Sequence, residues 1–266
     1  MEKLLAPARP VRRSTGVKGG NFRMAARRQS VTAQISRQAR RLSTVIAPQF
    51  TKIEPVNILQ KVEGVEIRLS DTAQYQRAVE QYIMRNSVQF DPVEFDILDP
   101  GGYRIMQASL YPDGLMVHEG KRKVCELSLA NDEDSPCCIV KIKHPVTSMT
   151  VYELRDMGGT ICIQSNTDEM DGTRIVPSRA TWMSLLFACG CVFSRERWLL
   201  LTQDTTRAVI APVSSFFREN TVKIEWATSS ENEIRLIGLS FGLIQMIREA
   251  YPSLMHIVKE FRTRRG

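Results

Sequence analysis

The sequence predicts an α+β fold, in which a disordered or helical basic N-terminal arm precedes a body with a central antiparallel β-sheet and flanking helices. Three observations lead to this prediction. Apolar runs of strand length fill the middle of the chain and are separated by closely spaced turn signals. Apolar residues at helical spacing lie on both sides of these runs. Basic residues are concentrated in the first 52 positions.

The charge distribution separates the arm from the body. Residues 1–52 hold twelve lysines and arginines and a single acid, Glu2, which is a net charge of +11. Because the whole chain carries +7, residues 53–266 together carry −4. We therefore divide the chain into a basic arm, 1–52, and one α+β domain, 53–266, whose last residues, 259–266, form a basic tip.

The arm itself has two parts. Residues 1–20 mix proline and glycine with basic residues and offer little apolar surface, so we expect them to be disordered. Residues 21–46 predict a basic amphipathic helix, because apolar side chains recur along one narrow stripe at Val31, Ile35, Ala39 and Leu42.

The first elements of the body are a strand and a helix. Residues 62–70 alternate apolar and polar side chains, which is typical of a half-buried strand. Asp71 can cap the helix that comes next. The apolar stripe of this helix has spacing i, i+3, i+4, i+7, i+8 and consists of Tyr75, Ala78, Val79, Tyr82 and Ile83.

The middle of the chain predicts a series of strands. Turn signals rich in Gly, Pro, Asp and Asn recur between about 93 and 165. The connections are too short for parallel crossovers, so the sheet should be antiparallel, which argues against a doubly wound dinucleotide-binding fold. The predicted strands are 103–110, 115–118, 123–129, 137–143, 149–154 and 160–164.

A third helix is expected over about 179–193, with Ser178 as its cap. Its residues are apolar on nearly all sides, which predicts a buried helix. Short strands should come after it at 198–201, 208–213 and 221–227.

The last predicted helix starts near Ser230, because Glu233 three residues later completes a capping box, and it ends before Pro252. Gly238 and Gly242 form a small-xxx-small pattern within it. In so short an apolar run this pattern indicates helix-to-helix contact, in the core or between subunits, rather than a membrane dimer.

No enzymatic site, metal site or cofactor is predicted. The six cysteines lack the paired spacing of a zinc site or of a disulfide framework, and no nucleotide-binding or hydrolase motif is present. Cys125 with His118 would form a catalytic pair only if folding brought them together, which we do not expect.

An intracellular, reducing environment is expected, because the cysteines do not form a disulfide framework, the N-terminus has no apolar signal region and the apolar runs are too short to span a bilayer. A mitochondrial location remains an alternative. The arm is Arg-rich and poor in acids, as presequences are, and residues 40–43 would suit a processing site.

A flexible Arg-rich arm on a near-neutral, strand-rich body resembles the plan of RNA-virus capsid and nucleocapsid proteins, and of some viral matrix and movement proteins. The resemblance implies a self-associating, non-enzymatic structural protein, in the virion or host cytoplasm, that binds RNA or DNA without sequence specificity, with RNA favoured and no small-molecule substrate. The alternatives are an imported mitochondrial protein with a cleaved arm, and a matrix-type protein that also binds a membrane surface. Arginine suits phosphate because its planar guanidinium donates two parallel hydrogen bonds. The predicted phosphate-binding residues are Arg9, Arg12, Arg13, Lys18, Arg23, Arg27, Arg28, Arg37, Arg40, Arg41, Arg262, Arg264 and Arg265.

Overall fold

The computed structural model describes residues 52–85, 91–129, 137–165, 170, 172–213 and 219–265. The arm up to Thr51, including the helix predicted at 21–46, lies outside these residues. The described structure is therefore that of the body, together with Lys52.

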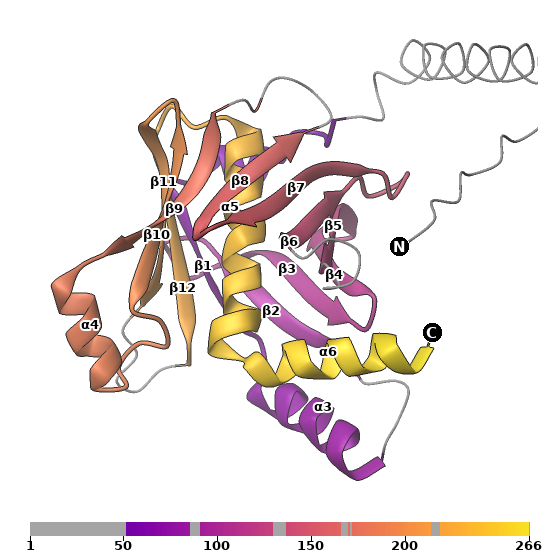
Figure 1. Ribbon diagram of the computed structural model, residues 1–266. Helices are drawn as coiled ribbons and strands as arrows, with labels where there is room; N and C mark the ends of the chain where they lie inside the picture. Colours follow the sequence, from indigo (N-terminus) through magenta and orange to yellow (C-terminus); the bar gives the residue numbers. More distant parts are fainter. Residues whose placement is uncertain are drawn as a thin grey trace, which may run out of the picture. The chain divides into compact units, whose positions relative to one another are not determined.

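Twelve antiparallel strands form a closed barrel (Figure 1). Each strand pairs with its neighbours in the sequence, and β1 pairs with β12 to complete the ring. The strands are β1 (Gly64–Leu69), β2 (Val93–Leu98), β3 (Arg104–Tyr111), β4 (Gly114–Glu119), β5 (Arg122–Leu129), β6 (Cys138–Lys143), β7 (Thr150–Met157), β8 (Thr160–Ser165), β9 (Thr173–Arg179), β10 (Glu196–Thr202), β11 (Thr205–Val213) and β12 (Thr221–Trp226).

The antiparallel pairing is confirmed, but the predicted α+β body with a central sheet and flanking helices is wrong. The turn signals between successive strands correctly indicated hairpins. Closure depends on the register of β1 against β12, in which Ile67 lies opposite Val222. Local sequence patterns carry no information about a pairing between such distant segments.

Alternation along the strands builds the inner wall of the barrel. In β1 the apolar residues of the alternation predicted over 62–70, Val65, Ile67 and Leu69, are all buried. The same alternation recurs across the ring, for example at Val222 and Ile224 in β12.

The helix predicted from Ser230 is α5 (Asn232–Gln245), and it lies inside the barrel (Figure 1). Every residue from Ile234 to Gln245 is buried, which explains why its apolar residues are not confined to one stripe. The predicted capping box is absent, since Glu231 is the N-cap residue and its side chain makes no capping bond. Gly238 and Gly242 face strands of the barrel wall and not another helix, so the predicted helix-to-helix contact is also wrong.

Two outer helices, α3 (Thr72–Arg85) and α6 (Pro252–Arg265), lie together at one end of the barrel (Figure 1). After α5 a π-helical turn, η3 (Met246–Ala250), leads to Pro252, which begins α6 as the sequence pattern of Pro at a helix start would suggest. The predicted cap of α3 is confirmed, because Asp71 accepts a hydrogen bond from the backbone N–H of Ala73 at 2.8 Å. Tyr75 of α3 packs against Tyr251 with ring centroids 5.1 Å apart.

A short helix, α2 (Asn57–Lys61), precedes β1 and contacts α5. In the described parts of the chain, no helix is long and apolar enough to cross a membrane.

The helix predicted over 179–193 is shorter than expected and is exposed. It is α4 (Thr181–Ala188), between β9 and β10, and Ser178 belongs to β9 instead of capping it. Only Met183 of this helix is buried. Figure 1 shows α4 projecting away from the barrel.

Candidate functional site

The predicted phosphate-binding residues fall into two groups. The ten in the arm lie outside the described residues. At the other end of the chain, Arg264 and Arg265 belong to α6, but their side chains also lie outside what the structure describes.

Arg262 is described, and its guanidinium serves the packing of the body. Its three nitrogens donate hydrogen bonds to the backbone carbonyls of Pro112, Asp113 and Leu129. Burial lowers its pKa below the usual value. Because these carbonyls lie at the β3–β4 turn and the end of β5, Arg262 joins α6 to the barrel end, which limits what it can offer a phosphate.

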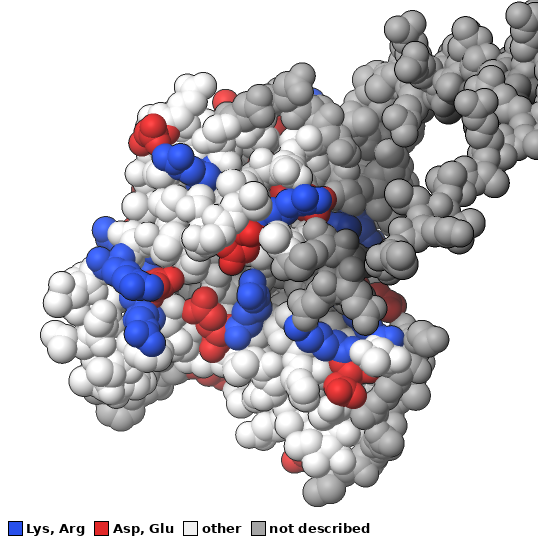
Figure 2. Space-filling view, viewed as in Figure 1, with Lys and Arg blue, Asp and Glu red and all other residues white. Residues whose placement is uncertain are grey.

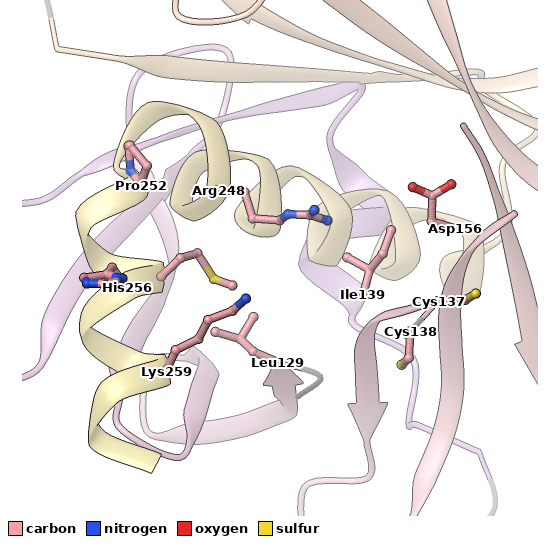
Figure 3. A pocket seen from close by; sticks show the side chains of 10 residues that line it. Leu129, Cys137, Cys138, Ile139, Asp156, Arg248, Pro252, His256 and Lys259 are labelled. Atoms are coloured by element: carbon pink, nitrogen blue, oxygen red, sulfur yellow. The ribbon is translucent and has the colours of Figure 1, made fainter. Parts of the chain in front are cut away.

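A groove of about 380 Å³ lies between the C-terminal helices and β6 in the described body (Figure 3). Arg248 of η3, with His256 and Lys259 of α6, supplies basic side chains to its lining. Figure 3 shows Arg248 and Lys259 extending toward the space between the helices and the strand. Asp156 is the acidic residue of the lining. The excess of basic groups suits an anion such as phosphate better than a cation.

Two neighbouring thiols, Cys137 and Cys138, also line this groove. Burial raises the pKa of Cys138 to about 12, with a further contribution from its hydrogen bond to Glu153. For Glu153 itself, burial acts to raise the pKa, but hydrogen bonds from Cys138 and Arg155 outweigh this and lower it. Cys138 is therefore a protonated thiol at neutral pH, unsuited to nucleophilic attack or metal binding.

The other cysteine and histidine candidates do not assemble. Cys125 is fully buried opposite Val117, whereas His118 is half-buried opposite Lys123, so the Cys125–His118 pair is not formed. Burial raises the pKa of Cys125 to about 12. Among the described residues, no three His, Cys, Asp or Glu side chains are placed to hold a metal ion.

The feature that the sequence prediction missed is the exposed surface of α4. Trp182, Leu185 and Phe187 expose 58%, 66% and 39% of their residue surface. We call these three side chains the apolar tip. The signal was present in the sequence as an apolar run within a hairpin whose ends carry Arg179 and Arg195. Apolar composition alone does not separate a buried helix from an exposed one, whereas arginines at both ends of the run favour an exposed one.

Comparisons of this chain with protein-family models, with curated proteins and with solved structures found no match.

Proposed function

We propose that this protein is a non-enzymatic, self-associating binding protein that holds RNA or DNA through its basic arm. The observation that carries the proposal is the net charge of +11 on residues 1–52, against −4 on the rest of the chain. Nine of the twelve basic residues are arginines, which can bind phosphate through two N–H groups at once. Phe22 and Phe50 are the arm's only aromatic residues, so phosphate neutralisation is favoured over base stacking.

The described body suits the role of a carrier for the arm. Since α5 fills the axis of the barrel, binding partners have access only to its outer surface. There the groove with Arg248, His256 and Lys259 supports a second, weaker contact with phosphate. All six cysteines are free thiols, which supports an intracellular, reducing compartment.

The test is binding of fluorescently labelled RNA and DNA to the full-length protein over a range of salt concentrations. If the ten basic side chains predicted in the arm each displace a counterion from single-stranded RNA, log K should fall with log salt with a slope of roughly −7. A truncation lacking residues 1–50 should lose most of this affinity and most of the slope. Affinity that survives the truncation without salt dependence would contradict the proposal.

The alternative function is that of an imported mitochondrial protein whose arm is removed. The observation that favours it is the sequence Arg40-Arg41-Leu42-Ser43, which resembles a presequence processing site. N-terminal sequencing of the protein from its native source separates the two functions. An intact arm supports nucleic-acid binding, whereas a start near residues 42–45 supports mitochondrial import.

A further inference from the structure

We propose that the apolar tip of α4 is a membrane-docking surface that inserts into the interfacial layer of an anionic membrane. This goes beyond the nucleic-acid binding proposed for the arm and depends on different residues. The two functions can therefore fail separately.

The orientation of α4 is the first argument. Successive residues of a helix are about 100° apart, so Leu185 lies nearly opposite Met183 on α4 and Trp182 lies about a quarter turn away from Met183. Met183 is buried, whereas Trp182 and Leu185 are more than half exposed. The helix therefore directs its large apolar side chains outward, the reverse of a helix that packs on a protein core. Exposed apolar surface of this kind marks an interaction site.

The helix is also held firmly in this orientation. Cys191 and Val192, just after α4, are buried like Met183. Gly190 has φ +72°, the left-handed conformation typical of a helix C-terminus, and its N–H donates to the carbonyl of Phe187 at 3.0 Å. Anchored at Met183 and after Gly190, α4 cannot fold its tip onto the barrel without breaking these contacts.

Charge at the base of α4 identifies the partner as anionic. Arg179, Arg195 and Arg197 lie where β9 and β10 meet the helix. Two carboxylates are close to them, Glu196, which pairs with Arg179, and Glu249 of η3, which hydrogen-bonds Ser194, so the arginines remain in excess. The Arg195 guanidinium is 5.1 Å from the centre of the Phe187 ring, so positive charge directly adjoins the apolar tip. Figure 2 shows a cluster of basic side chains on the side of the molecule where α4 projects. Residues 173–207 carry five arginines and two acids, although the body as a whole carries −4.

Apolar side chains beside arginines are the pattern of a surface that binds lipid headgroups. Tryptophan favours the boundary between headgroups and acyl chains, because its ring is apolar but its N–H is polar. Arginines close to that boundary are attracted by anionic lipids.

A second copy of the chain fits this surface less well. A large side chain buries at most about 250 Å², so at their exposed fractions the three tip residues offer roughly 250–400 Å². A stable interface needs about 800 Å² from each partner. A symmetric dimer through α4 would also place the same arginines against one another, which disfavours association.

The test is binding of the full-length protein to phosphatidylcholine vesicles with and without phosphatidylserine. The arm is expected to contribute salt-sensitive attraction, so affinity is measured again at about 1 M salt, where the Debye length is ~3 Å. If the apolar tip inserts into the membrane, binding should persist in high salt, and brominated lipid should quench the fluorescence of Trp182. The double variant Trp182→Ser, Leu185→Ser should bind about a hundredfold more weakly in high salt.

The matched control is Ile83→Ser with Val146→Ser, which removes two similarly exposed apolar side chains, 67% and 80% exposed, from other parts of the body. It should bind vesicles like the wild type. Both double variants should keep the wild-type melting temperature, because all four side chains are exposed. Equal vesicle affinity of the tip variant and the control would overturn the proposal. So would a tip variant whose only defect is loss of a dimer in sedimentation velocity, which would assign α4 to contact between copies.

Discussion

Arg235 is a charged side chain inside the barrel, with only 5% of its surface exposed. Its Nη1 donates to the carbonyls of Leu59 and Val62, at 2.5 and 2.6 Å, and its Nε donates to the carbonyl of Ser230 at 3.2 Å. The guanidinium also lies over the Trp226 ring, 5.4 Å from its centre. Burial lowers the pKa of Arg235 from its usual value. The side chain thus connects the segment around α2 to the start of α5.

Replacing Arg235 with lysine should lower the free energy of unfolding by about 2–4 kcal/mol, because a single ammonium cannot reach all three carbonyls and each buried carbonyl left unpaired costs ~1–3 kcal/mol. Urea denaturation measures the change. The control is Arg207→Lys, since Arg207 donates to the exposed Ser229 hydroxyl, and its cost should stay within about 0.5 kcal/mol. Equal losses in the two variants would show that Arg235 is not a structural tie.

A second prediction at this scale concerns Glu153 and acid. Its folded pKa lies below the usual 4.5, so its ionised form adds stability above about pH 4.5 that is lost as the pH falls through the folded pKa. Glu153→Gln should therefore be less stable than the wild type at pH 7, by about 1 kcal/mol. Chemical denaturation at pH 7 and at pH 3 should show this difference shrinking in acid. A difference that is the same at both values would contradict the prediction.

Among the elements, α5 has two glycines with different surroundings. A Cβ on Gly242 would lie 2.8 Å from Ile224 Cδ1 and 3.0 Å from Ile67 Cδ1, whereas on Gly238 its nearest neighbour would be Trp226 Nε1 at 3.3 Å. Alanine gains ~1 kcal/mol of helix propensity over glycine, but overpacking costs ~1–3 kcal/mol. We expect Gly242→Ala to destabilise by about 1–2 kcal/mol and Gly238→Ala to stay within ~1 kcal/mol of the wild type.

The steric cause can be tested by rescue. Ile224→Val removes the Cδ1 atom that the new Cβ at position 242 would approach most closely, so the double variant Gly242→Ala, Ile224→Val should be more stable than the sum of the two single changes predicts. Simple additivity of the urea-denaturation free energies would mean that the helix shifts instead of clashing.

Elements with strong local periodicity could be predicted from the sequence, and others could not. The strand at β1 and the cap of α3 followed from alternation and from Asp71. Strand β9 was missed, since it contains Pro177, and proline is unfavourable within a sheet. Strand β2 was missed although it alternates. The prediction that α4 is buried was wrong, because composition shows how apolar a helix is but not which residues pack against it.

At the scale of the whole molecule, local sequence patterns again predict some parts of the candidate sites and not others. The arm is evident from charge alone, and its predicted role in binding remains to be tested. The groove draws Cys138 from β6 and Lys259 from α6, more than a hundred positions apart in the sequence, and only the fold brings them together. Enclosure of α5 likewise depends on β1 meeting β12, which no local pattern encodes.

That enclosure makes the C-terminal segment essential for the barrel. Seven large apolar residues of α5 are buried, Ile234, Leu236, Ile237, Leu239, Phe241, Leu243 and Ile244. At ~1.5–3 kcal/mol each their burial is worth roughly 10–20 kcal/mol, comparable to or larger than the ~5–15 kcal/mol net stability of a typical protein.

A chain ending at Ala227 should therefore fail to fold, with no near-ultraviolet circular dichroism and no cooperative unfolding. A peptide of residues 228–266 added in trans should restore both signals. Removing residues 1–50 is the matched comparison: the described core begins at Ile53, so the melting temperature should be unchanged. Cooperative unfolding of the chain ending at Ala227 would mean that the strands close without their central helix.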